Sequence, residues 1–143
     1  MTITALGFDY GTHSIGTAIG QNLTCSATPL PAVRAEYGEP DWKKIDELIK
    51  EWKPQILVVG LPLNMDGTDQ KITELARNFA RELENRYQLK CHLRDERLTT
   101  VSAREQLFNN GGYRALKKGK VDSLSAVLIL EAFLEELAGN SSN

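Results

Sequence analysis

The sequence is poor in the residues that hold structural zinc or form disulfide frameworks. It has two cysteines and two histidines among 143 residues. Cys25 and Cys91 are far apart in the sequence and lack the spacing of metal ligands. The two histidines, His13 and His92, are too few to complete a zinc site with them. These absences argue against a Cys/His zinc site and predict two reduced, buried thiols in a cytoplasmic protein.

Long apolar runs are also missing. Runs such as Val127–Leu130 are too short to span a bilayer, and the N-terminus has no basic region followed by an apolar stretch. We therefore expect neither a membrane partner nor a secretory signal. Hydrophobic residues make up 41% and charged residues 25%, which is typical of a globular protein. The length predicts one domain, residues 1–138, followed by a disordered polar tail, residues 139–143.

The net charge is small, −2, but its distribution is uneven. Lys90–Lys120 contains eight basic and three acidic residues, whereas Val121–Asn143 contains four acidic residues and no basic ones. Such asymmetry can place a basic surface beside an acidic pocket, but charge alone favours the simpler interpretation, a solvated surface of helices and loops.

Apolar periodicity predicts an α/β fold with a mixed five-stranded sheet, three antiparallel strands followed by two parallel ones, flanked by helices. The strands are expected at Thr2–Asp9, Ile15–Gly20, Cys25–Val33, Ile56–Val59 and Cys91–Leu93. Prolines confine the third strand to an edge.

Helices and loops are expected between and after these strands. Helices are predicted at Asp41–Trp52, from about Thr68–Gln70 onward, from Thr99 or Thr100 to Asn109–Gly112, and at Val121–Leu137. Thr68 or Asp66 is expected to cap the second of these helices, with phosphate binding at its N-terminus as the alternative. Arg34–Pro40 and Gly111–Lys120 are expected to be loops, the second of them flexible.

Three carboxylates are candidates for one site. Asp9 ends an apolar strand, is the only acid in the first 35 residues, and precedes Gly11, which permits a tight turn. Glu96 follows the last strand and Asp122 begins the buried final helix, so the three can converge at the carboxyl edge of the sheet. Carboxylates without His or Cys ligands suit two Mg²⁺ or Mn²⁺ ions. Alternatively, Asp9 caps its turn, Asp122 caps its helix and Glu96 forms a surface ion pair.

Several motifs in order resemble the YqgF (RuvX) family. They are Gly7–Gly11 with Ile15–Gly16, Val59–Thr68, Asp95–Thr100 and Lys118–Asp122. The resemblance covers nearly the whole chain. It implies a ribonuclease-H-like fold and a bacterial cytoplasmic hydrolase, a nuclease that processes the 5′ end of precursor 16S rRNA during ribosome biogenesis or resolves Holliday junctions. By motif position, Asp9, Glu96 and Asp122 would be the catalytic, metal-binding acids.

Within that resemblance, Asp9 is expected to bridge two metal ions, with Glu96 holding one and Asp122 the other. Asp95, the nearest rival ligand, is expected to point away from Glu96 because strand residues alternate. The predicted nucleic-acid contacts are Arg94, Arg97, Arg104, Arg114, Lys117, Lys118 and Lys120. Tyr113 is a candidate for base stacking, with a loop anchor as the alternative.

Three other functions remain open. The Asp9–Thr12 turn also suits an actin-like phosphotransferase, although such enzymes need two domains to enclose ATP. A non-catalytic nucleic-acid-binding factor could keep the fold without turnover. Within the nucleases, the substrate is either precursor RNA, which we favour, or junction DNA. The absence of an apolar stripe for dimerisation favours RNA and predicts a monomer or weak dimer, with ribosomal or processing factors as protein partners.

Overall fold

The computed structural model describes residues 2–95 and 118–141. Its strands are β1 (Thr4–Asp9), β2 (Ser14–Gln21), β3 (Ser26–Glu36), β4 (Glu39–Pro40), β5 (Ile56–Leu61) and β6 (Lys90–Asp95). Its helices are α1 (Trp42–Trp52), α2 (Lys71–Tyr87) and α4 (Lys118–Ser141). Within α4, side chains are described from Ser123 to Gly139.

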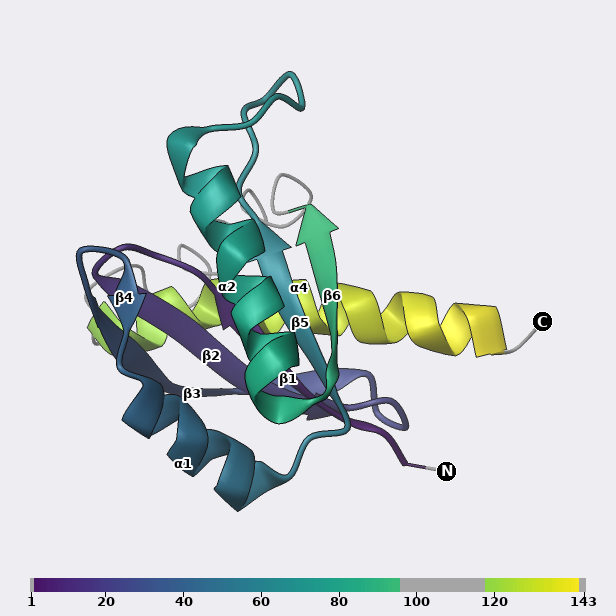
Figure 1. The fold of residues 1–143 in the computed structure, drawn as a ribbon. Helices are drawn as coiled ribbons and strands as arrows, with labels where there is room; N and C mark the ends of the chain where they lie inside the picture. The colour runs from purple at the N-terminus through teal and green to yellow at the C-terminus, as the bar shows by residue number, and fades with distance from the viewer. Residues whose placement is uncertain (1, 96–117, 142–143) are drawn as a thin grey trace.

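The strands form one mixed sheet in the order β4-β3-β2-β1-β5-β6 (Figure 1). β1 pairs antiparallel with β2 and parallel with β5, and β5 pairs parallel with β6, as predicted. The expected count of five strands is one short. Glu39–Pro40, expected within a loop, pairs with Ala35 and Glu36 as β4. A strand of two residues has too few positions to show an alternating pattern.

β3 lies near the edge of the sheet, where its prolines were expected to place it. The pairing of β2 with β3 shifts register between Ile15 and Thr17, so that Thr17 faces Leu30 and Ile15 faces Val33. The irregularity places Pro31 opposite the shift. Proline has no N–H to donate, so a bulge near a sheet edge accommodates it without breaking a regular ladder.

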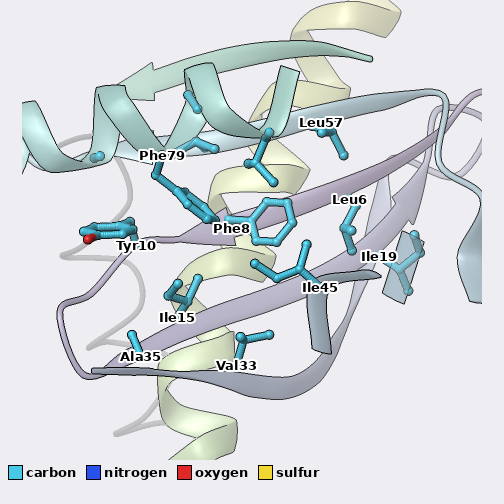
Figure 2. Packing of buried hydrophobic residues seen from close by; sticks show 14 residues of the cluster. Leu6, Phe8, Tyr10, Ile15, Ile19, Val33, Ala35, Ile45, Leu57 and Phe79 are labelled. Carbon is cyan, nitrogen blue, oxygen red and sulfur yellow. The ribbon is translucent and has the colours of Figure 1, made fainter. Parts of the chain in front are cut away.

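Apolar clusters cover both faces of the sheet. α1 and α2 pack on one face, where Ile45 and Phe79 lie beside Phe8 in one buried cluster (Figure 2). The rings of Phe8 and Phe79 meet edge to face, with centroids 5.4 Å apart. α4 crosses the other face (Figure 1).

Small residues allow α4 to lie close to the sheet. Ala5 and Ala18 are fully buried beneath it, and a Cβ added to Gly7 would lie 3.1 Å from the Cβ of Leu130. A larger residue at Gly7 would therefore push α4 away from β1.

Helix boundaries agree with the predictions in part. α1 ends at Trp52, and the next residue, Lys53, adopts a left-handed conformation before Pro54. The expected cap of α2 was wrong. Gln70 is its N-cap, and the Gln70 N–H donates to Thr73 Oγ1 at 2.8 Å. The carboxylate of Asp66 instead accepts from the backbone N–H of Thr68 at 3.0 Å, which closes the preceding loop.

α4 is longer at both ends than expected. Lys118–Lys120 are helical, not part of a loop, and the helix continues through Gly139 to Ser141 into the segment expected to be disordered. A formed helix gains one hydrogen bond for each added residue, so the packed turns around Phe133 and Leu134 extend into polar sequence. Within the described ranges, none of the helices has the length and apolar character that crossing a bilayer requires. The predicted helix from Thr99 or Thr100 lies outside the described residues.

Candidate functional site

Asp9 is the last residue of β1 and pairs with Gly16 of β2. Successive strand residues point to opposite faces, so Ala5, Gly7 and Asp9 share one face. Ala5 packs in the α4 cluster, and Gly7 lies against Leu130 of α4. Asp9 therefore lies on the α4 side of the sheet, half-buried at its carboxyl edge.

Gly11 forms the turn that follows Asp9. A Cβ at this position would lie 2.3 Å from the backbone oxygen of Ser14, well inside contact distance. Only glycine fits, because the chain folds back on itself within a few residues. The predicted role of Gly11 in a tight turn is confirmed by this geometry.

The N-terminal part of α4 is fixed near Asp9 by Ser123 in its second turn, a residue that is fully buried. Its Oγ accepts from the backbone N–H of Thr17 at 3.4 Å and donates to the backbone oxygen of Leu30 at 2.5 Å. Thr17 directly follows Gly16, the partner of Asp9. The backbone of Asp122, one residue before Ser123, therefore lies at the same edge and on the same face as Asp9. The Asp122 side chain is outside the described residues.

The end of β6 brings further charges to this edge. Arg94 pairs with Gly60 and Asp95 with Leu61 across β5. Leu61 packs in the α1–α2 cluster, so Asp95 lies on that face, away from α4. Glu96, the second predicted acid, lies outside the described residues.

Of the predicted nucleic-acid contacts, only Arg94 has a described side chain. Its guanidinium forms an ion pair with Glu136 of α4, with Nη1 and Oε1 2.5 Å apart, and its side chain is 18% exposed. A phosphate would have to replace Glu136 to reach it. Lys118 and Lys120 lie on the first turn of α4, without described side chains. The other predicted residues lie outside the described ranges: Arg97, Arg104, Arg114, Lys117 and the stacking candidate Tyr113.

Arg34 is a candidate that the sequence prediction missed because the residue was assigned to a loop. It lies in β3, is exposed, and pairs with Ser14. Its neighbours Val33 and Ala35 belong to the α1–α2 cluster, so Arg34 points to the other face, the face of Asp9. The alternation of apolar and charged residues from Val33 to Glu36 is the signal that could have extended the strand.

Cysteine and histidine chemistry does not fit this site. Burial, with a smaller contribution from Glu84, raises the pKa of Cys91 to about 12, so its thiol stays protonated at neutral pH. Burial also lowers the pKa of His92, whose ring packs on Phe133 of α4 with centroids 4.8 Å apart. Both are packing residues in β6.

Within residues 2–95 and the described part of α4, no three His, Cys, Asp or Glu side chains come together as a metal-binding group. Asp9 is the described member of the predicted acidic site. Its predicted partners are Glu96 and Asp122, whose side chains are not described. The hydrogen bonds of Ser123 place the backbone of Asp122 at the edge of the sheet that carries Asp9.

Curated relatives cover almost the full chain. A Klebsiella pneumoniae protein named "Putative pre-16S rRNA nuclease" is 57% identical over 136 residues, which cover 95% of this chain and 99% of the relative. A Haemophilus influenzae protein of the same name is 58% identical over 135 residues, covering 94% and 97%.

Solved structures with the same fold are much more distant in sequence. Thermus thermophilus RuvC in complex with a Holliday junction substrate has a TM-score of 0.57 at 12% identity, over 94% of this chain and 96% of that one. Fowlpox virus resolvase in complex with Holliday junction DNA has the same TM-score and identity, over 94% and 99%. The family model described as RuvX, Holliday junction resolvase, matches residues 3–136, and the chain therefore belongs to the RuvX family.

Proposed function

We propose that this protein is a metal-dependent nuclease that hydrolyses phosphodiesters in precursor 16S rRNA, with Asp9, Glu96 and Asp122 as its metal ligands. The observation that carries the proposal is the contact from Thr17 to Ser123, which places the start of α4 beside the strand that pairs with Asp9. Two of the three acids therefore come from distant parts of the sequence to one edge. We place the activity in the bacterial cytoplasm, in a monomer or weak dimer that works with ribosomal or processing factors.

The donor atoms available at this edge fit Mg²⁺ or Mn²⁺. Carboxylate oxygens are the ligands that these hard ions prefer, and Cys91 and His92 are held in packing contacts. Two bound ions would activate water and stabilise the leaving oxygen of the phosphodiester. The contribution of the chain is to fix Asp9 at the end of a paired strand and to hold α4 through Ser123.

Arg34 is well placed to contact the substrate backbone. Arg34 lies in β3, two strands away from β1. Asp9 pairs with Gly16 of β2 and Arg34 pairs with Ser14 of β2, so Arg34 is also displaced by two residues along the strand direction. Strand spacing and rise put its Cα about 12 Å from that of Asp9. This corresponds to roughly three to four nucleotide steps along a duplex axis, at about 3.4 Å per step. Arg34 would thus bind a phosphate a few nucleotides from the cleaved bond.

RNA is our proposed substrate because the relatives at 57–58% identity carry the rRNA nuclease name. Junction DNA is the second candidate, supported by the shared fold with two junction-bound resolvases. Fold similarity at 12% identity does not select a substrate.

The experiment is cleavage of a precursor 16S rRNA 5′-leader fragment with Mg²⁺ or Mn²⁺ and with EDTA, beside a four-way DNA junction. Asp9→Asn keeps the size of the side chain and removes its charge. We expect it to abolish metal-dependent cutting while folding and RNA binding persist. Asp95→Asn is the matched control, since Asp95 lies at the same edge but on the opposite face. We expect it to cut RNA as the wild type does.

Each result has a defined meaning. If Asp9→Asn cuts as fast as the wild type, the site assignment is wrong. Cutting of the junction alone transfers the proposal to DNA recombination. Binding without cutting of either substrate, in the presence of either metal, favours the non-catalytic factor.

A further inference from the structure

The most exposed large apolar side chain on the described surface is at the tip of the β3–β4 hairpin. Tyr37 is 97% exposed, so almost none of its ring contributes to the core. The hairpin projects at the end of the sheet that carries β4 (Figure 1). An aromatic ring left in solvent gains no stability from burial, which makes its presence here informative.

The turn itself does not favour tyrosine. Glu36 pairs with Glu39, leaving Tyr37 and Gly38 as a two-residue loop. Their φ angles are +50° and +84°, as in a type I′ turn. Asn-Gly and Asp-Gly are the usual sequences there, because a side chain with a bulky Cβ substituent is strained at positive φ. Tyrosine at this position therefore costs stability and is not explained by the folding of the hairpin.

The hairpin is fixed to the turn that follows Asp9. The Gly38 N–H donates to the Thr12 oxygen at 3.0 Å, and the Ala35 N–H donates to the His13 oxygen at 3.0 Å. The hydroxyl of Tyr10 donates to the Gly38 oxygen at 2.5 Å. Tyr37 is thus presented by a braced element at the carboxyl edge of the sheet, the edge that carries Asp9.

We propose that Tyr37 is a stacking platform for an unpaired base of the RNA substrate. This inference rests on the proposed nuclease function and names the form of RNA that the site accepts. Aromatic rings stack on bases of any sequence. A base can stack on a protein ring only where it is unpaired, because a paired base is already stacked within its helix.

The charges beside Tyr37 favour contact with a base over contact with the backbone. Glu36 and Glu39 flank the turn, and Glu39 also accepts from Trp42 Nε1 at 3.1 Å. These carboxylates repel phosphates. A duplex carries its phosphates on its outer surface, so we expect it to bind poorly at this turn. A single strand can turn its base toward the ring and its phosphates away, toward Arg34 on the Asp9 face.

The test measures binding in the Asp9→Asn background, where the RNA stays intact. Fluorescence anisotropy is recorded with a labelled single-stranded leader RNA and with the same sequence as a duplex, over a range of salt concentrations. For Tyr37→Asn we expect about 5- to 100-fold weaker binding of the single strand. Duplex binding and the slope of log affinity against log salt should stay unchanged, because no charge is removed. Arg34→Gln, by contrast, should lower the magnitude of that slope by about 1.

Controls separate stacking from a folding defect. Tyr37→Asn should unfold at a temperature equal to or above that of the parent, since Asn-Gly suits the turn. Tyr37→Phe and Tyr37→Trp keep a ring and should keep single-strand affinity. Leu23→Asn changes another exposed apolar residue, 67% exposed, in the β2–β3 connection at the opposite edge, and should bind as the parent does.

Unchanged single-strand binding by Tyr37→Asn overturns the inference. So does an equal loss on duplex and single strand, or a changed salt slope, because neither is a signature of base stacking. The binding readout does not depend on hydrolysis. A protein that binds RNA through Tyr37 but never cuts it refutes only the proposed hydrolysis, whereas a wild type that binds no RNA refutes both.

Discussion

At the scale of single residues, the site depends on positions where the surrounding backbone leaves no space for a side chain. Gly11 is the clearest case, because an added Cβ would lie 2.3 Å from the Ser14 backbone oxygen. A backbone atom cannot rotate away as a side chain can, so the turn after Asp9 must open. We expect Gly11→Ala to lower the free energy of unfolding by about 1–3 kcal/mol and to reduce cleavage. Urea unfolding and the leader-cleavage assay measure the two effects.

Gly139 provides the matched control. It lies in α4, is exposed, and has no atom within 4 Å of an added Cβ. Gly139→Ala should leave stability unchanged or raise it by up to about 1 kcal/mol, because alanine favours a helix. Equal unfolding midpoints for Gly11→Ala and the wild type would show that the turn can accommodate a Cβ and that glycine is not required at position 11.

Residues of the site differ in how far the sequence could predict them. Asp9 and Gly11 stand out because a lone acid and a glycine follow an apolar strand. Arg34 and Tyr37 lie in a polar segment, Arg34–Pro40, whose glycine and proline predict a loop and not a strand. Tyr37 can be recognised as a candidate contact only when its exposure and its positive φ angle are known, and a local sequence pattern gives neither.

At the scale of elements, the contact between α4 and the part of β2 where its pairing with β3 shifts register positions the site. The Ser123 hydroxyl bonds two backbone groups, the buried N–H of Thr17 and the partly buried oxygen of Leu30. Ser123→Ala leaves both without this partner and should cost about 1–3 kcal/mol of stability. Hydrogen exchange of the Thr17 amide should accelerate, and cleavage should slow because the N-terminal part of α4 loses its anchor.

Ser26→Ala is the comparison for Ser123→Ala. Its hydroxyl is bonded to that of Thr24 in an exposed position, where water can replace the partner. We expect no measurable change in stability or in Thr17 exchange. If Ser123→Ala also left Thr17 exchange unchanged, the hydroxyl would not be what holds α4 to β2.

The elements themselves were predictable to different degrees. The periodic apolar stripe of α1 and the apolar run of β5 gave the right element types, and the parallel pairing of β1 with β5 followed from the rule that such crossovers are right-handed. The start of α2 was misplaced because Asp66 and Thr68 have the composition of a cap but bond within their own loop. The ends of α4 extended because packing, not local composition, determines where a buried helix stops.

At the scale of the whole molecule, one fold serves nucleases with different substrates. The described sheet shares its architecture with resolvases at 12% identity, so the fold explains where a site lies and not what it cuts. The net charge of −2 is also uninformative by itself. The residues that could select a substrate are local features of this chain, such as Arg34 and Tyr37.

The proposed metal site makes a prediction about the stability of the entire domain. A ligand that binds only the folded state stabilises it by about 2.7 kcal/mol at 100 times its dissociation constant. For a domain of this length, that corresponds to a rise of very roughly 10 °C in Tm. We expect Mn²⁺ or Mg²⁺ to raise the Tm of the wild type toward this value, measured by calorimetry without any nucleic acid.

Asp9→Asn should lose most of this rise. Without metal, the same variant should be as stable as the wild type or more so, because removal of one carboxylate relieves repulsion among neighbouring acids. Asp95→Asn, on the opposite face, should keep the full rise. A metal-dependent shift that is equal in Asp9→Asn and the wild type would place the ions elsewhere on the protein. Since this readout needs no substrate, it separates an incorrect metal site from an incorrect choice of RNA.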